Sequence, residues 1–202
     1  MSPTNVVVLI PESTRKRRGG DASATPVDGI VASLPAQSRK RLESLREDLR
    51  SATKGSGVEP VGLMPAYRRY DGNMYRRIDV SDWERRDPGV EVVIVSGLLG
   101  LVASRDTIPA YVHSMAEPMP PLGKLNRWWH ERGLPDVLGD YLIAVHPPSV
   151  VDLLSLEYRE AVAGFGDRLK VPVKTIDFPG MGRASQPARG KAIAKILRTG
   201  RA

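Results

Sequence analysis

The sequence contains no cysteine among its 202 residues, and it contains only three histidines and two phenylalanines. Without cysteine the chain can form no disulfide, bind no zinc through thiolates and use no thiolate nucleophile. The histidines, His113, His130 and His146, lie far apart and have no paired ligand three or four residues away. We therefore expect no metal site and no other cofactor.

Long hydrophobic runs are also missing from the sequence. The apolar run at residues 6–10 is far too short for a membrane span or for the core of a signal peptide, and no later run reaches that length. We expect no membrane partner and a cytoplasmic protein. The absence of cysteine agrees with that compartment.

Positive charge is what the sequence has in excess. Thirty lysines and arginines face 23 acidic residues, which gives a formal net charge of +7. The basic residues cluster at 15–18, 39–41, 68–69, 76–77 and 85–86. Such a balance is typical of proteins that bind nucleic acid or other phosphate-bearing partners, and also of basic surfaces with no such partner. Protein partners cannot be inferred from this pattern.

Strands and helices alternate along the chain. Buried strands are predicted at 5–10, at 90–95 and at the start of 150–158, and an alternating strand at 168–178. Amphipathic helices are predicted at 36–53, 122–132 and 187–198, whereas 136–144 fits a helix or a strand. The order predicts an α/β fold with a mainly parallel central sheet flanked by helices, in a single domain over 1–202.

Two segments have the composition of loops. Residues 12–33 are rich in glycine, serine, proline and charge, and predict a long mobile loop. Residues 54–62 predict a second loop. Short turns are predicted at 71–73 and 87–89, on either side of a short helical segment around Trp83.

Polar residues follow three of the predicted strands. Residues 12–16 follow the first strand, Ser96 and Gly97 follow the second, and residues 155–158 follow the third. Ligands of open α/β sheets bind beyond the carboxyl ends of strands, and glycine lets a ligand approach the backbone closely. We expect the three strand ends to form one cleft, although each glycine taken alone is explained by a turn.

An aromatic and basic segment, residues 63–79, allows two interpretations. Tyr67, Tyr70 and Tyr75 interleave with two arginine pairs, which suits stacking on nucleobases with contacts to phosphates. Packing of the tyrosines into the core with their hydroxyls outward is the favoured alternative.

Five blocks of the sequence resemble the peroxide stress protein YaaA family. They are VVVLIP at 6–11, AYRRYDGNMYRRID at 66–79, IVSGLLGLVASRDTIPAY at 94–111, VVDLLSLEYREAV at 150–162 and ARGKAIAKIL at 188–197. The blocks follow the family's order and span nearly the whole chain. The resemblance implies an α/β fold with an inserted helical element and a cytosolic protein that limits peroxide damage to DNA. It also implies DNA binding.

The resemblance also selects candidate site residues. The residues that match the family pattern are Gly72, Tyr75, Ser96, Gly97, Gly100, Asp106, Tyr111, Ser155, Glu157, Tyr158, Arg189 and Gly190, and Lys16 matches with a gap. The sequence departs from the pattern at Asn73, where the family has aspartate, and at Ala103 and Val112, where it has arginine.

Two hypotheses of function follow. The first is a YaaA-like protein of the peroxide-stress response that binds DNA or nucleotides through arginines. The second is an enzyme that acts on a nucleoside or small phosphorylated substrate, with Asp106 or Glu157 as the general acid or base. In the second, Tyr75 or Tyr111 would orient the substrate, and Ser96, Gly97 and Arg189 would hold its anionic oxygens. Lys16, Gly100, Ser155 and Tyr158 are further binding candidates.

Overall fold

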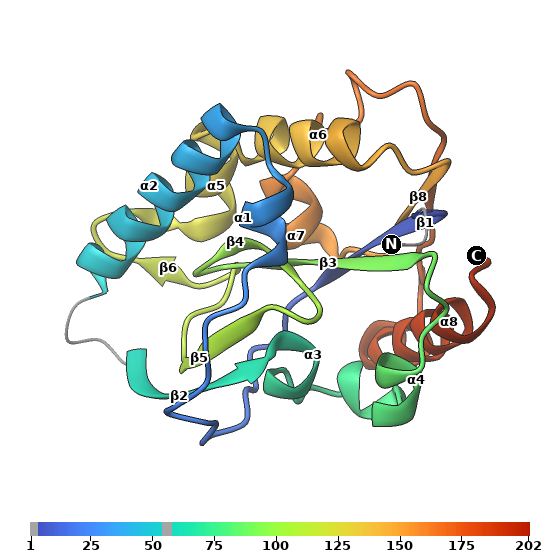
Figure 1. The fold of residues 1–202 in the computed structure, drawn as a ribbon, viewed down its shortest axis with the longest axis horizontal. Helices are drawn as coiled ribbons and strands as arrows, with labels where there is room; N and C mark the ends of the chain where they lie inside the picture. Colours follow the sequence, from blue (N-terminus) through green and yellow to red (C-terminus); the bar gives the residue numbers. More distant parts are fainter. Residues whose placement is uncertain (1–3, 54–57) are drawn as a thin grey trace.

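A five-stranded sheet forms the centre of the computed structural model, which describes residues 4–53 and 58–202 (Figure 1). The strands lie in the order β4-β3-β1-β8-β9. Four of them run parallel, namely β1 (Val6–Pro11), β3 (Val90–Ser96), β8 (Ser149–Asp152) and β9 (Val173–Thr175). Only β4 (Gly100–Ala103) is antiparallel, to β3 at one edge. The predicted α/β fold with a mainly parallel sheet is confirmed.

The two central strands are apolar because both faces of the sheet are covered. Every residue of β1 is buried, and in β3 only Glu91 is less than fully buried. Runs of valine and isoleucine fit such strands, since branched side chains pack well on a pleated surface. Val6 pairs with Val90 and Pro11 with Val95, so β1 and β3 end at the same level.

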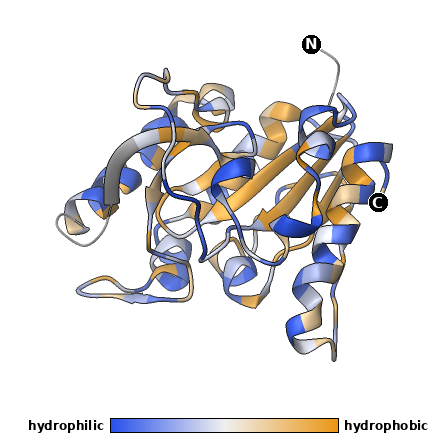
Figure 2. Ribbon diagram, turned by 90° about the horizontal axis from the view of Figure 1, so that it is seen from below, coloured by the Kyte–Doolittle hydropathy of each residue, from blue (hydrophilic) through white to orange (hydrophobic). Residues whose placement is uncertain are grey.

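Helices cover the two faces of this sheet (Figure 1). On one side lie α2 (Ala36–Ala52), α5 (Leu125–Glu131) and α6 (Leu134–Val145). On the other lie α3 (Ala66–Arg69), α4 (Val80–Glu84) and α8 (Ser185–Thr199). The hydropathy colouring of Figure 2 shows the apolar strands enclosed between these layers. No helix of the described residues is long and apolar enough to cross a bilayer.

Helix α2 shows how the sequence pattern produces the packing. Leu42, Leu45 and Leu49 occupy one stripe of the helix and are buried, while arginines and glutamates occupy the exposed face. The predicted helix at 36–53 is therefore confirmed to within one residue. The predicted C-terminal helix is also present as α8, two residues longer at its start.

The predicted loop at 54–62 is wrong over its described part. Residues 54–57 lie outside the described residues, but 58–62 belong to β2 (Val58–Pro65). This strand pairs antiparallel with β5 (Thr107–Tyr111) to form a separate two-stranded sheet with an irregular register. The hydrogen bonds that define β2 therefore come from a partner more than forty residues away. Three short helical segments, α3, η1 (Tyr75–Arg77) and α4, then lead to β3.

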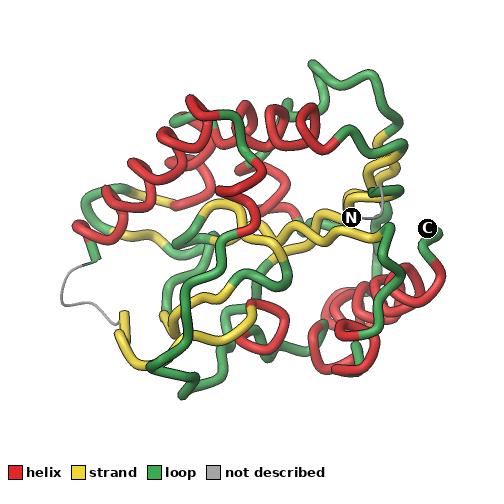
Figure 3. The backbone as a smooth tube through the Cα atoms, in the orientation of Figure 1, coloured by secondary structure: helices red, strands yellow, loops and turns green. Residues whose placement is uncertain are grey.

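The predicted loop at 12–33 needs a smaller correction. Most of it lacks regular structure, as the tube in Figure 3 shows, but it ends in helix α1 (Gly29–Ser33). Two backbone bridges, from Lys16 to Tyr70 and from Asp21 to Leu63, attach the loop to the segment that contains β2 and α3.

The remaining elements refine the predicted boundaries. Residues 136–144 are helical, within α6. The helix predicted at 122–132 begins only at Leu125, after a small hairpin of β6 (Pro118–Met119) and β7 (Gly123–Lys124). The strand predicted at 168–178 is limited to the three exposed residues of β9, and the helix after β8 is α7 (Leu156–Ala161).

Candidate functional site

Glu12 is the centre of a buried polar cluster at the carboxyl ends of β1 and β3. Its Oε1 accepts a hydrogen bond from the backbone N–H of Gly97 at 2.8 Å. Its Oε2 accepts hydrogen bonds from the hydroxyl of Tyr111 at 2.5 Å and from that of Ser96 at 3.3 Å. Glu12 directly follows β1, so the parallel pairing places it beside the end of β3. The sequence pattern alone did not select Glu12 as a site residue.

Lys16 supplies the positive charge of this cluster. Its Nζ lies 3.6 Å from Oε2 of Glu12, donates a hydrogen bond to the backbone carbonyl of His113 at 2.8 Å and sits 4.0 Å from the ring centre of Tyr111. The side chains of Lys16 and Glu12 are both buried. Burial lowers the pKa of Lys16, and the charge of Glu12 opposes this effect.

Two tyrosines extend the cluster through their hydroxyls. The hydroxyl of Tyr111 lies 2.6 Å from that of Tyr70 and 2.8 Å from that of Ser96. Burial, and then the negative charge of Glu12, raise the pKa of Tyr111 well above its ordinary value, so both rings carry neutral phenols at physiological pH. We call Glu12, Lys16, Tyr70, Ser96 and Tyr111 the Glu12 cluster.

Gly97 is required at the end of β3 by a close approach of two backbone segments. A Cβ atom at this position would lie 2.6 Å from the backbone nitrogen of Met115 and 2.9 Å from Oε1 of Glu12. The carbonyl of Gly97 accepts a hydrogen bond from Trp129, so protein groups occupy both sides of this peptide. Gly100 has a positive φ of 68° and packs against Trp129. The structure thus directs neither glycine toward an open cavity.

A cavity of about 350 Å³ opens beyond the strand ends. Glu12, Ser13 and Thr14 line it from the segment after β1, and Ser155, Glu157 and Tyr158 line it from the start of α7. Tyr75 closes a third side and donates a hydrogen bond from its hydroxyl to the carbonyl of Pro11 at 2.9 Å. This strand-end cavity therefore brings together five of the residues that the sequence selected, namely Gly72, Tyr75, Ser155, Glu157 and Tyr158.

A second cavity of about 440 Å³ adjoins the same segment. Its basic wall consists of Arg15, Lys16, Arg17 and Arg18, and the end of β5, including Tyr111 and the exposed Val112, forms the facing wall. Thr14 lines this basic cavity and the strand-end cavity alike.

The arginines of the basic cavity differ in their partners. Arg17 lies 3.4 Å from Asp71, whereas neither Arg15 nor Arg18 forms an ion pair within residues 4–53 and 58–202. The guanidinium of the fully buried Arg69 donates hydrogen bonds to the carbonyls of Arg17 and Gly19 and so holds the segment in place. Arg15 and Arg18 are exposed and keep their guanidinium groups available to an anion.

Asp106 takes a different place from the one predicted for a catalytic acid. Its carboxylate accepts hydrogen bonds from the backbone N–H groups of Gly29, Ile30 and Ala103, and it lines neither of the two cavities. Burial raises the pKa of Asp106 to about 6, against the effect of these hydrogen bonds. Asp106 thus fixes the start of α1 against the end of β4, and its position gives no support to a catalytic role.

Arg189 is also separate from both cavities. It is buried in α8, one turn after Gln186, which lines the strand-end cavity. Its Nε and Nη1 have no hydrogen-bond partner among the residues that the structure describes, and its guanidinium lies 5.3 Å from the ring centre of Phe178. Tyr111 lines the basic cavity and Glu157 lines the strand-end cavity, whereas Asp106 and Arg189 line neither, so these four candidate residues do not share either cavity.

The aromatic segment is mostly core. Tyr70 and Tyr75 are buried, and their hydroxyls point to internal partners instead of outward as predicted. Only Tyr67 is partly exposed, beside Arg68 and Glu84. The two arginines at 68–69 also differ in their surroundings. Arg68 forms an ion pair with Glu84 at the surface, whereas Arg69 is buried and donates hydrogen bonds inside the protein. Within the described residues, no group of three or more histidines and acidic residues is arranged for a metal ion.

Comparison with known proteins assigns the chain. The family model for the peroxide stress protein YaaA matches residues 25–198. The chain belongs to this family. It is 27% identical to UPF0246 protein SCO2297 of Streptomyces coelicolor, over 98% of this chain and 85% of that protein. It is 28% identical to UPF0246 protein TM1040_2658 of Ruegeria sp., over 79% of this chain and 66% of that protein.

Two of the three positions at which the sequence departs from the pattern of the YaaA family lie on cavity walls. Asn73 lines the strand-end cavity, where the pattern has aspartate, and Val112 lines the basic cavity, where it has arginine. Ala103, the third departure, is buried in β4 beside the Asp106 carboxylate. Differences at cavity walls change what a cavity can bind while leaving the fold intact.

Proposed function

We propose that this protein binds the phosphate groups of DNA or of a nucleotide in the basic cavity, as part of the role in peroxide stress that its family membership supports. The observation that carries the proposal is the pair of exposed guanidinium groups, Arg15 and Arg18, beside a cavity of about 440 Å³. Arginine offers planar, bidentate donors that match phosphate oxygens. We place this role in the cytoplasm, where such partners occur.

The geometry favours binding at this cavity over the other arginine clusters. Arg39 donates to carbonyls around the end of α1, and Arg86 pairs with Glu91, so these side chains are already engaged within the protein. Arg69 is fully buried. Of the clusters recognised in the sequence, only 15–18 combines free guanidinium groups with a cavity, among the residues that the structure describes.

The test is a binding measurement with the double variant Arg15→Ala/Arg18→Ala. The probes are a short DNA duplex and a nucleoside monophosphate, each titrated at several salt concentrations. We expect weaker binding, and for DNA a salt slope reduced by roughly one for each phosphate group that the variant no longer binds. Binding of the duplex but not of the mononucleotide would identify DNA as the partner, and the reverse would identify a nucleotide.

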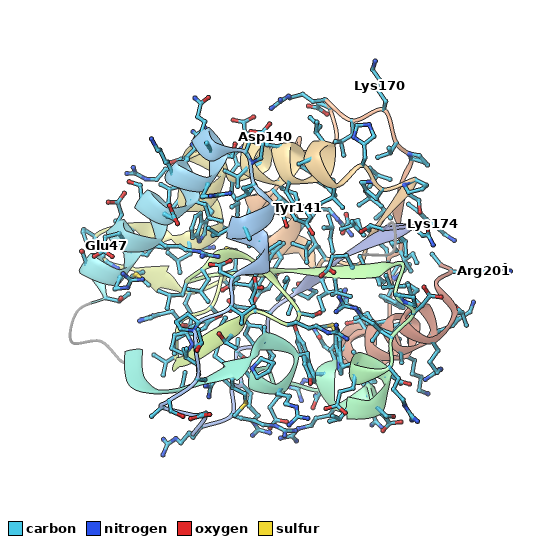
Figure 4. All side chains as sticks on the ribbon, viewed as in Figure 1. Glu47, Asp140, Tyr141, Lys170, Lys174 and Arg201 are labelled. Atoms are coloured by element: carbon cyan, nitrogen blue, oxygen red, sulfur yellow. The ribbon has the colours of Figure 1, made fainter. Side chains whose placement is uncertain are left out.

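A control with the same change in charge is Lys170→Ala/Arg201→Ala. Both residues are exposed, and Figure 4 shows them at the periphery of the protein. If binding depends on net charge alone, this control will lose as much affinity as the cavity variant. That result, or binding that does not change with salt, would remove the basic cavity from consideration.

A second function is favoured by one specific observation. Glu12, Glu157 and Tyr158 line the strand-end cavity, which adjoins the basic cavity at Thr14. We propose as the alternative an enzyme that acts on a nucleoside or a small phosphorylated compound, with Glu157 as the general acid or base. Glu12 is less suited to this role because its carboxylate already accepts three hydrogen bonds.

This alternative is tested with Glu157→Gln. The variant keeps the shape of the side chain and removes its proton-transfer capacity. A screen of nucleosides and sugar phosphates with the wild-type protein comes first, and turnover that persists in Glu157→Gln would eliminate this residue as the catalytic group. Absence of turnover with every compound, together with salt-dependent DNA binding, would leave the first proposal alone.

A further inference from the structure

Five aromatic side chains form an unbroken series from the Glu12 cluster to the surface. The ring centres of Tyr111 and Tyr70 lie 6.5 Å apart, and those of Tyr70 and Tyr75 lie 5.3 Å apart. Trp83 follows at 6.4 Å from Tyr75, and Tyr67 at 5.6 Å from Trp83. At these separations each aromatic ring contacts the next one directly, without an intervening aliphatic side chain.

The two ends of the series have different surroundings. Tyr111 lines the basic cavity, and Tyr70, Tyr75 and Trp83 are buried behind it. Tyr67 is partly exposed at the far end, on the short helix α3. The series therefore connects a cavity on one side of the β2–β5 sheet to solvent on the other side of the buried rings.

A carboxylate accepts the phenol proton at each end. Tyr111 donates to Oε2 of Glu12 at 2.5 Å, and Tyr67 donates to Oε1 of Glu84 at 3.4 Å. A tyrosine that loses an electron becomes a strong acid, so a neutral tyrosyl radical persists only where a base takes up its proton, whereas the rings between the two ends carry the charge only in passing. Packing of the core would require the rings but not a base at both terminal hydroxyls.

Lys16 reinforces this requirement at the inner end. Its ammonium lies 4.0 Å from the ring centre of Tyr111, where it disfavours a positive charge on that ring. Burial keeps Tyr111 a neutral phenol before oxidation, because it raises the pKa of that hydroxyl. Oxidation of Tyr111 must therefore transfer the electron and the proton together and leave a neutral tyrosyl radical.

We propose that the series Tyr111, Tyr70, Tyr75, Trp83 and Tyr67 conducts an electron from the surface to an oxidant in the basic cavity. The oxidant is a one-electron oxidant formed from hydrogen peroxide, such as the hydroxyl radical. It takes one electron from Tyr111 and becomes hydroxide, while the phenol proton of Tyr111 passes to Glu12. This step does not depend on whether DNA or a nucleotide binds in the cavity.

The second step restores the inner tyrosine. One electron passes from Tyr67 through Trp83, Tyr75 and Tyr70 to the Tyr111 radical, which takes its proton back from Glu12. The phenol proton of Tyr67 passes to Glu84, which is exposed and releases it to neutralise the hydroxide. The sum is the conversion of one hydroxyl radical to water and of Tyr67 to a tyrosyl radical at the surface, where a solution reductant can repair it.

The test places an oxidant at one defined end of the series. Val112→Cys introduces a single thiol at the basic cavity, since the sequence has no other cysteine and Val112 is 59% exposed. A light flash excites a thiol-reactive ruthenium complex on this residue, an electron acceptor added to the solution then oxidises the complex, and a nitroso spin trap captures the radicals formed. Mass spectrometry of tryptic peptides then locates the adducts. We expect an adduct on Tyr67.

The deciding variant is Tyr75→Phe, because Tyr75 is the link between Tyr70 and Trp83. In Val112→Cys/Tyr75→Phe the adduct on Tyr67 should disappear, and an adduct on Tyr111 or Tyr70 should remain. Trp128→Phe is the matched control, since Trp128 contacts Trp129 and no ring of the series. Should Tyr75→Phe fail to fold, Tyr70→Phe interrupts the series at the neighbouring link.

A label at Lys170→Cys controls for oxidants that escape into solution. Lys170 lies at the upper edge of the molecule in Figure 4, whereas α3 lies in the lower half of the same view in Figure 1, so a label at Lys170 should give no adduct on Tyr67. The proposal is wrong if the Val112→Cys label gives no Tyr67 adduct in the otherwise unchanged protein. It is equally wrong if that adduct persists when Tyr75 or Tyr70 is phenylalanine.

Discussion

Replacing Glu12 with glutamine should remove a large part of the folding stability. The substitution keeps the volume of the side chain but removes the negative charge beside the buried ammonium of Lys16. Breaking a buried ion pair on one side costs about 3–5 kcal/mol, because the remaining charge is buried without compensation. Domains of this kind have roughly 5–15 kcal/mol in total, so the loss is severe but need not unfold the protein.

Urea denaturation measures this loss directly. With a slope of about 2 kcal/mol per molar, a loss of 4 kcal/mol lowers the midpoint by roughly 2 M. The second variant, Glu12→Gln/Lys16→Met, removes the stranded charge and should recover most of the stability. A double variant no more stable than the single one would show that Lys16 is not the source of the cost.

The pH dependence provides an independent check. Burial lowers the pKa of Lys16 in the folded protein relative to the unfolded chain, so the unfolded chain binds more protons in the range between the two pKa values. Stability therefore rises with pH through that range. Without Glu12 the folded pKa falls further, and the rise should begin at a lower pH in Glu12→Gln than in the wild type. Parallel curves would refute the reasoning.

Two other substitutions follow from the same structure. Gly97→Ala inserts a Cβ atom 2.6 Å from the backbone of Met115, and we expect it to lower the free energy of unfolding by about 1–3 kcal/mol in thermal or urea denaturation. The control is Gly166→Ala, whose Cβ atom would meet only Val173 at 3.8 Å. This control should lower the free energy of unfolding by less than ~0.5 kcal/mol. Asp106 has a folded pKa raised to about 6, so its contribution to stability is present at acidic pH and is lost as the pH rises through that value. Asp106→Asn should abolish this loss of stability, which amounts to about 3 kcal/mol for a pKa raised by roughly two. If the variant and the wild type show the same dependence of stability on pH from ~4 to ~7, the assignment is contradicted.

The elements that could be predicted from the sequence are those whose signal is local. The leucine spacing of α2 and the branched residues of β1 and β3 each lie within one element, and each element formed as expected. Strand β2 was missed because its segment is rich in glycine and proline. Its regular structure depends on pairing with β5, which no local pattern reveals.

The candidate site was predictable only in part for the same reason. Ser155, Glu157 and Tyr158 reach one cavity because they follow a strand, which is a rule that can be applied to a sequence. Asp106 was chosen because it lies in a family block, but its partners Gly29 and Ile30 lie at the start of α1, more than seventy residues away in the sequence. Glu12 is adjacent in sequence to the predicted residues, yet its importance arises from donors 84, 85 and 99 residues away.

Thr14 lines both the strand-end cavity and the basic cavity, so the two cavities share one wall. A single stretch of backbone, residues 12–18, faces the strand-end cavity with its first residues and the basic cavity with its last. A ligand that moves this stretch on one side changes the affinity on the other, and by reciprocity the second ligand changes the first affinity by the same factor.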